Sequence, residues 1–173
     1  IVAGDTKVVE RGSGDGVFIN TAGVGVVPEG VHVSAANARP GDVVLLSGAI
    51  GDHGLAIMTR REGLQFSSPL ASDCAPLNDL VAAMLEVCLE IHVLRDPTRG
   101  GVATALNEVA QRSGVGIEIV EANVPVHAPV QAAAELLGLD PLYVANEGKL
   151  LAIVPEREAS AVLEAMHAHM YGT

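Results

Sequence analysis

Residues 91–109 read IHVLRDPTRGGVATALNEV, and this stretch decides the fold class. The apolar run from Ile91 to Leu94 is typical of a short strand. Asp96 to Gly101 follow as a turn, and apolar residues between Val102 and Val109 recur at helical spacing. A strand that passes through a glycine-rich loop into a helix is the repeating unit of α/β domains. The stretch therefore predicts a layered α/β domain.

The same alternation extends over the rest of the chain. We expect further strands at residues 17–27, 43–46, 116–120, 142–145 and 150–154. We expect further helices at residues 55–61, 76–89 and 130–137, and a last helix that begins at Pro155. The last two strands are predicted to form a hairpin. Together these elements predict the α/β (α+β) class with a mixed sheet.

Composition and charge exclude several classes of function. The net charge of −11 argues against a nucleic-acid-binding surface. No apolar run approaches the ~20 residues that a membrane-spanning helix needs, and no secretory leader is visible. The two cysteines lack metal-ligand spacing; we expect a loop thiol at Cys74 and a buried thiol at Cys88. These features fit a reducing cytoplasm.

A polar motif, GDTKVVERG, occupies residues 4–12. Lys7 offers a mobile positive charge, Thr6 a small hydrogen-bonding group and Asp5 a hard oxygen for Mg2+. These groups suit a phosphate chain and its metal at the end of a strand. Their spacing is not that of a Walker A loop or a dinucleotide fingerprint. From the residues alone, an ordinary polar turn stays open as the alternative.

Two glycine-rich loops are candidate anion sites. In DPTRGG, residues 96–101, Asp96 or Thr98 can cap the helix, and the twin glycines let a phosphate or another backbone come close. Arg99 beside a helix N-terminus favours the phosphate over a plain capping loop. In SGAIGDHG, residues 47–54, a tight turn that needs glycine for packing is favoured over an anion cradle.

The turn Asn146-Glu147-Gly148-Lys149 carries the remaining candidate. Turn geometry is sufficient to explain Asn146 and Gly148. Glu147 at the tip is either solvated or, if it lies in a cleft, a general base or a group that steers a lysine. Both interpretations stay open at the level of the residues.

Four segments, GDTKVVERG, SGAIGDHG, LRDPTRGGVATALNE and ANEGKLLAIVP, occur in this order. Together they resemble the HypE family of hydrogenase maturation proteins. These are ATP-dependent carbamoyl dehydratases in the superfamily of aminoimidazole ribonucleotide synthetase, selenophosphate synthetase and thiamine-monophosphate kinase. The resemblance implies that residues 1–37 are the last strands of an N-terminal ATP-binding domain. Residues 38–173 would form a three-layer α/β/α C-terminal domain, partly ferredoxin-like, as in aminoimidazole ribonucleotide synthetase.

The resemblance also implies a reaction. ATP drives dehydration of a carbamoyl group on a C-terminal cysteine to a thiocyanate, which supplies cyanide ligands to the iron of NiFe hydrogenase. The implied cofactors are ATP and Mg2+. The implied partners are a carbamoyltransferase, an iron-carrying hydrogenase maturation complex and, in the full-length protein, a second copy.

The same family pattern implies roles for individual residues. Lys7 would contact or activate the phosphate, and Glu147, positioned by Asn146, would act as the base. The expected nucleotide-binding residues are Asp5, Thr6, Lys7, Thr98, Arg99 and Gly100. The expected metal ligands are Asp5 and Asp96.

The chain departs from the family pattern at both ends. We expect a piece of a longer protein, without the family's C-terminal cysteine tail and without the first part of the ATP-binding domain. Such a piece is expected to be inactive alone and to bind ATP weakly or not at all. Two alternatives stay open: another ATP-dependent member of the superfamily, such as a selenophosphate synthetase, and a non-catalytic docking module.

Overall fold

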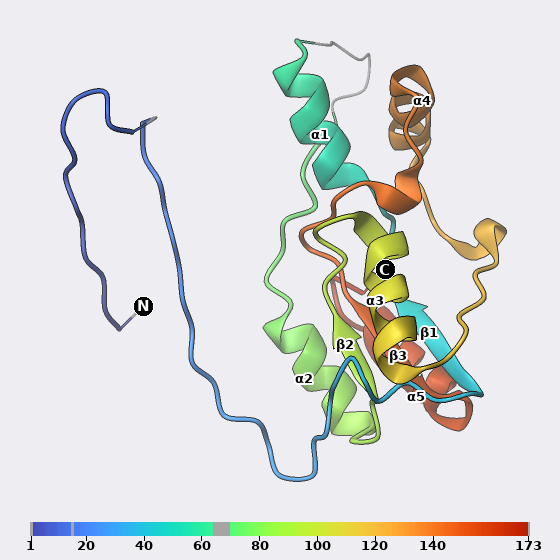
Figure 1. The fold of residues 1–173 in the computed structure, drawn as a ribbon. Helices are drawn as coiled ribbons and strands as arrows, with labels where there is room; N and C mark the ends of the chain where they lie inside the picture. Colours follow the sequence, from blue (N-terminus) through green and yellow to red (C-terminus); the bar gives the residue numbers. More distant parts are fainter. Residues whose placement is uncertain (1, 15, 64–69, 173) are drawn as a thin grey trace.

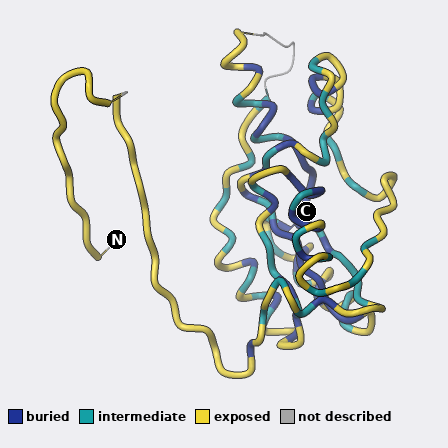
Figure 2. The backbone as a smooth tube through the Cα atoms, viewed as in Figure 1, coloured by how far each residue is buried: buried dark blue, intermediate teal, exposed yellow. Residues whose placement is uncertain are grey.

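The computed structural model describes residues 2–14, 16–63 and 70–172. The chain divides into an extended N-terminal segment and a folded body (Figure 1). Every described residue before Val31 is exposed, and Val31 is the first buried one (Figure 2). The described part of the N-terminal segment contains no helix or strand, so the strand expected at residues 17–27 is wrong. A strand needs a hydrogen-bonded neighbour, which this segment does not find in the described chain.

Three strands form one antiparallel sheet inside the folded body. They are β1 (Asp42–Leu46), β2 (Val93–Arg95) and β3 (Leu151–Pro155), in the order β1-β3-β2. Ile153 of β3 lies opposite Val44 of β1 and Val93 of β2. The mixed sheet expected from the sequence is therefore wrong for the described residues. β1 and β2 do run in the same direction, but β3 is inserted between them and pairs antiparallel with both.

Helices cover both faces of this sheet. They are α2 (Asn78–Val87), α3 (Gly101–Ser113) and α5 (Glu156–His167). On β3, Ala152 and Val154 join the hydrophobic cluster of α2 and α5, whereas Leu151 and Ile153 join the cluster of α3 on the other face. All five residues of β3 are buried because the strand is central and covered on both faces. The three α/β/α layers confirm the expected fold class (Figure 1).

A smaller hydrophobic cluster lies beyond one end of the sheet. There α1 (Asp52–Arg61) packs against α4 (Ala128–Leu137), with Leu55 and Val130 fully buried between them. These two helices occupy the top of Figure 1. Helices expected at residues 55–61, 76–89 and 130–137 and after Pro155 are thus confirmed. In the described part of the chain, no helix has the length and apolar character needed to cross a membrane.

Two further strand expectations are wrong. Residues 142–145 do not form a hairpin with β3, because both edges of β3 are already paired with β1 and β2. A 3-10 turn, η2 (Pro141–Tyr143), occurs there, and the Asp140 carboxylate caps it by accepting a hydrogen bond from the N–H of Leu142. Residues 116–120 also form no strand; they line one wall of a groove of about 870 Å³ beside the free edge of β1.

Candidate active site

Asn146 joins the three loops that the sequence singled out. Its side chain is fully buried, and its Oδ1 accepts a hydrogen bond of 2.8 Å from the N–H of Gly51. Its Nδ2 donates to the carbonyl oxygens of Pro97, at 3.1 Å, and Val144, at 3.0 Å. Residues 47–54 follow β1, residues 96–101 follow β2 and residues 146–149 precede β3. Since β3 is antiparallel to both neighbours, all three loops lie at the same end of the sheet.

Four N–H groups of the loop of residues 47–54 form hydrogen bonds inside the protein. Ser47 donates to the carbonyl of Leu150, Ile50 to that of Pro125 and Gly54 to that of Ala145. The N–H of Gly51 is taken by Asn146. A Cβ at Gly54 would overlap the side chain of Val144. The packing interpretation of this loop is therefore confirmed, and these backbone groups are not free to hold an anion.

The loop of residues 96–101 leads into α3 without a side-chain cap. Gly100 is the N-cap in the left-handed region, with φ 72°, so the capping role expected for Asp96 or Thr98 is wrong. At Gly101, a Cβ would overlap the carbonyl oxygen of Leu142 in η2, which explains why glycine stands there. Arg99 and Gly100 are exposed at the start of α3, where N–H groups and a guanidinium suit a phosphate.

Glu147 projects from the turn between two anchored neighbours. Asn146 before it is fixed by its hydrogen bonds, and Gly148 after it is buried. A Cβ at Gly148 would overlap the backbone carbonyl of Asp73, so the turn rests directly on residues 73–75. Glu147 itself is exposed. An exposed carboxylate on a rigid support has the access and the geometry that a general base needs.

A buried ion pair supports the turn from below. Lys149 Nζ lies 3.6 Å from Oδ2 of Asp73, and the two side chains are 16% and 7% exposed. Sequence reasoning missed both residues as functional candidates. The place of Lys149 directly after the turn was an available signal, but nothing in the local sequence around Asp73 marks it.

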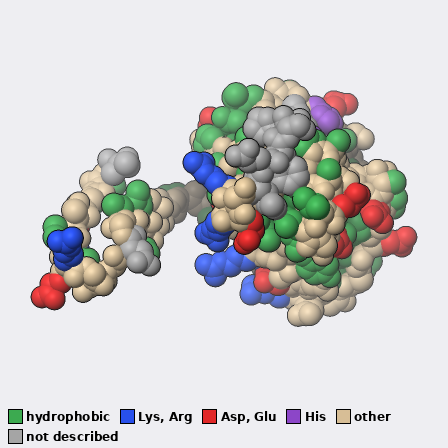
Figure 3. Space-filling model, turned by 90° about the horizontal axis from the view of Figure 1, so that it is seen from above, with side chains coloured by type: hydrophobic (Ala, Val, Ile, Leu, Met, Phe, Trp, Pro, Cys, Tyr) green, Lys and Arg blue, Asp and Glu red, His purple; other side chains and the backbone are tan. Residues whose placement is uncertain are grey.

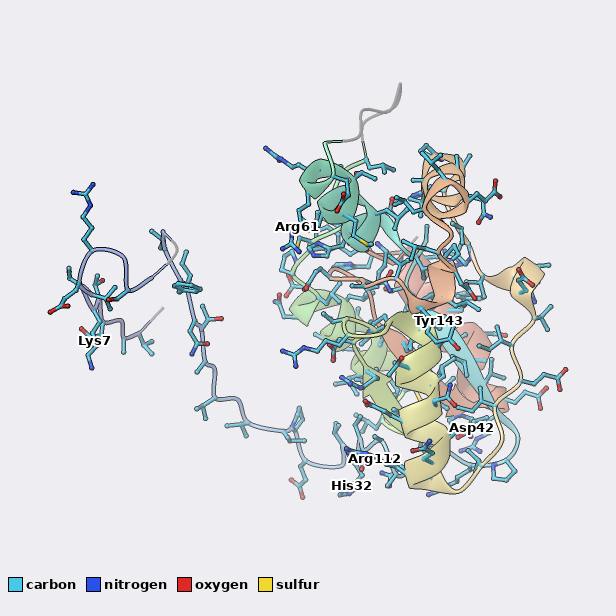
Figure 4. All side chains as sticks on the ribbon, turned by 45° about the horizontal axis from the view of Figure 1, so that its top comes forward. Lys7, His32, Asp42, Arg61, Arg112 and Tyr143 are labelled. Atoms are coloured by element: carbon cyan, nitrogen blue, oxygen red, sulfur yellow. The ribbon has the colours of Figure 1, made fainter. Side chains whose placement is uncertain are left out.

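The motif of Asp5, Thr6 and Lys7 lies apart from these loops. All three residues are exposed on the extended segment, and Figure 4 shows Lys7 away from the folded body. The structure thus brings Asp96, Thr98, Arg99 and Gly100 to the same end of the sheet as Asn146 and Glu147. It does not bring residues 5–7 to them.

The described residues form no cage of protein ligands for a magnesium ion. A hard cation takes several oxygen ligands, and no group of three or more His, Cys, Asp or Glu side chains comes together in the described ranges. Asp96, one of the two expected ligands, is already paired with Arg95 through an Nη1–Oδ1 distance of 2.6 Å. The other, Asp5, lies on the extended segment.

Basic side chains gather at one flank of this otherwise acidic protein. Figure 3 shows them on the side of the folded body that faces the N-terminal segment.

Next to the site, Arg95 donates to Glu108 at 3.0 Å, and this hydrogen bond raises the pKa of Arg95 above its ordinary value. Arg95 thus stays positively charged and forms ion pairs with both Asp96 and Glu108.

The fold and these loops define a class: a three-layer α/β/α domain whose glycine-rich loops converge on one buried asparagine. The family model described as AIR synthase related protein, C-terminal domain, matches residues 39–171. The chain belongs to this family.

Characterised relatives and solved structures agree with this assignment. The chain is 62% identical to carbamoyl dehydratase HypE of Azotobacter vinelandii over 172 residues, which are 99% of this chain and 50% of that protein. It is similar to a chain of the HypE–HypF complex, with a TM-score of 0.81 and 52% identity over 83% of this chain and 47% of that one. It is also similar to HypE in complex with ATP, with a TM-score of 0.77 and 51% identity over 80% and 42% of the two chains. The chain thus spans about half the length of the relatives it matches.

Proposed function

We propose that the full-length protein containing this chain is an ATP-dependent carbamoyl dehydratase of hydrogenase maturation. The observation that carries the proposal is the 62% identity to a carbamoyl dehydratase over 99% of the chain. The substrate is a carbamoyl group on a C-terminal cysteine, and the product is a thiocyanate that supplies cyanide to the iron of NiFe hydrogenase. Residues 1–37 belong to the ATP-binding domain and residues 38–173 to the C-terminal domain.

The reaction needs a leaving group and a base. The carbamoyl oxygen attacks the γ-phosphorus of ATP, ADP leaves, and the nitrogen loses one proton. The second N–H proton is then removed while the C–O bond breaks and phosphate departs, which leaves S–C≡N. Lys7 neutralises charge on the transferred phosphoryl group, and Glu147 accepts a proton from nitrogen. The exposure of Glu147 beside the buried Asn146 supports this role.

The other proposed site residues are chosen by where they lie in the structure. Thr98, Arg99 and Gly100 stand at the start of α3, where exposed donors suit the nucleotide phosphates. Asp5 and Thr6 accompany Lys7 on the N-terminal segment. Because residues 5–7 and Glu147 lie apart in this chain, the complete site requires the rest of the ATP-binding domain. This chain alone is therefore inactive and binds ATP weakly or not at all.

The proposed partners are a carbamoyltransferase and an iron-carrying maturation complex. The similarity to a chain of the HypE–HypF complex supports the first of these. We further propose that the full-length protein is a homodimer in the cytoplasm.

The test follows the intact mass of the full-length protein, carbamoylated on its terminal cysteine, during incubation with Mg-ATP. We expect the carbamoyl adduct to lose one water. Lys7→Ala and Glu147→Gln should abolish this loss, whereas the control Glu164→Gln, on the exposed outer face of α5, should not. ATP consumption without a change in the adduct would instead indicate a kinase-like relative. No ATP consumption, with partner complexes intact, would indicate a docking module.

A further inference from the structure

The fold buries the carboxylate of Asp73. Its side chain is 7% exposed, and among the described residues neither Oδ1 nor Oδ2 has a hydrogen-bond partner. Burial of a carboxylate without compensation is strongly unfavourable. Within the described chain, compensation comes from the ammonium of Lys149, whose Nζ lies 3.6 Å from Oδ2. Because burying this carboxylate is unfavourable, its presence calls for a role other than stabilising the fold.

Asp73 holds the turn of residues 146–149 at two points. Its carboxylate attracts the ammonium of Lys149, and its backbone carbonyl lies against the Cα of Gly148, where a side chain has no room. The backbone nitrogen of Ala75 also lies next to Gly148, and a Cβ at Gly148 would be only 2.7 Å from it. The C-terminal half of the turn is thereby fixed to residues 73–75.

The N-terminal half of the turn is fixed by a different set of contacts. Asn146 is bonded to Gly51 and to Pro97, in the two glycine-rich loops. Glu147 therefore stands between two independently anchored residues. Such support is what a reacting carboxylate needs, since small displacements of a catalytic group cost large factors in rate.

The ion pair with Asp73 also affects whether Lys149 can pair with the Glu147 carboxylate. Lys149 is two residues from Glu147 and has a long, flexible side chain. Held by Asp73, its ammonium is kept away from the Glu147 carboxylate. Released, it would be free to pair with that carboxylate, and a carboxylate paired with an ammonium is a weaker base.

We propose that Asp73 is a positioning residue for the dehydration reaction: through Lys149 and Gly148 it fixes the turn that presents Glu147 and keeps the lysine away from it. This inference rests on the proposed function, in which Glu147 is the base.

The decisive variant is Asp73→Asn in the full-length carbamoylated protein, assayed well below its melting temperature. We expect kcat for loss of water to fall on the order of 10- to 100-fold, with KM for Mg-ATP unchanged. Lys149→Arg keeps the charge and should keep most of the rate. Lys149→Met should lose both rate and thermal stability, because it leaves Asp73 buried alone. The double variant Asp73→Asn/Lys149→Met should regain thermal stability but not rate, which separates positioning from folding.

A second readout does not depend on activity. Hydrogen exchange of the peptide covering residues 144–150 should become faster in Asp73→Asn than in the unsubstituted protein. The matched control is Glu90→Gln, which removes the exposed partner of Arg157 at the opposite end of the sheet and should change neither exchange nor rate.

The outcomes separate this inference from the proposed function. If Glu147→Gln abolishes dehydration while Asp73→Asn keeps full kcat, the positioning role is overturned and the proposed function stands. If Glu147→Gln keeps full activity, the proposed role of Glu147 fails, and the positioning role fails with it. Unchanged exchange over residues 144–150 in Asp73→Asn would also overturn the inference. A lower kcat with faster exchange and unchanged KM would support it.

Discussion

Oδ1 of Asn146 accepts a hydrogen bond from the N–H of Gly51, a residue that precedes it by 95 positions. The amide nitrogen of the same side chain donates to the carbonyls of Pro97 and Val144. One fully buried side chain thus satisfies backbone groups from three separate parts of the chain. Such a network favours the observed arrangement of the loops, because breaking it leaves buried polar groups without partners.

Asn146→Ala should therefore destabilise this chain. The substitution removes the hydrogen-bond partner of the N–H of Gly51 and of the carbonyl of Val144, whereas the carbonyl of Pro97 keeps its bond from the backbone N–H of residue 146. Each buried unsatisfied group costs about 1–3 kcal/mol. Urea unfolding followed by circular dichroism measures the change. Asn20→Ala, on the exposed N-terminal segment, is the control and should leave the midpoint where it is. Equal midpoints for the two variants would contradict the role of the network.

Gly101→Ala should be more destabilising than Gly114→Ala. The two glycines have nearly the same backbone conformation, with φ of 66° and 68°, so the strain of an L side chain is matched. At Gly101 the added methyl group overlaps the carbonyl oxygen of Leu142, whereas at Gly114 no atom of the described residues lies within 4 Å of it. We expect an additional loss of about 1–3 kcal/mol at Gly101, measured as the difference in unfolding free energy. A smaller loss at Gly101 would show that η2 moves aside freely.

Met166→Ala and Met170→Ala test the packing of α5. Met166 is fully buried in the cluster with Met84 and Val162, whereas Met170 is 75% exposed. Removal of the buried side chain should cost about 2–5 kcal/mol, because it leaves a cavity. Removal of the exposed one should change stability by about 0.5 kcal/mol or less. Thermal unfolding of both variants gives the comparison, and similar melting temperatures would argue against α5 as a core layer.

The helices could be predicted from the sequence because their information is local. Apolar residues at helical spacing specify α2, α3 and α5 within a few residues, with Pro76 before α2, Pro155 before α5 and Gly114 after α3 as end signals. The three layers follow, because strands alternating with such helices bury both faces of a sheet.

Strand pairing could not be predicted in the same way. Residues 142–145 have the composition of a strand, yet β3 takes β1 and β2 as its neighbours, and Asp140 caps a 3-10 turn instead. Which edges of a strand are occupied depends on segments far away in the chain.

The same distinction applies to the candidate site: features encoded in the local sequence could be predicted, whereas contacts between distant residues could not. Glu147 and Arg99 were recognised by residue type in a turn and at a helix start. The hydrogen bond from Gly51 to Asn146 and the ion pair of Asp73 with Lys149 were not, because each joins residues more than 70 positions apart. The partners of the N–H groups of Ser47, Ile50, Gly51 and Gly54 also lie far away in the chain, so the local sequence favours a tight turn at residues 47–54 without showing which groups it pairs with.

The two cysteines should differ in reactivity toward a thiol reagent. Cys74 is exposed, whereas Cys88 is 5% exposed, and its burial raises the pKa of the thiol above its ordinary value. A raised pKa lowers the fraction of thiolate, the reactive form, at any pH below it. In the folded chain near neutral pH we therefore expect one thiol to react with iodoacetamide, and both to react in guanidinium chloride. Peptide mapping should place the native label on Cys74.

The raised pKa of Cys88 predicts how the stability of the chain depends on pH. The folded state binds the Cys88 proton more tightly than the unfolded state does, so stability from this group is present at neutral pH and declines as pH rises into the alkaline range. Unfolding free energy measured under reducing conditions should fall with alkaline pH less steeply in Cys88→Ala than in the unsubstituted chain. Cys74→Ala serves as the control and should keep the original slope. Parallel slopes for all three proteins would show that the Cys88 thiol ionises as easily in the folded state as in the unfolded one.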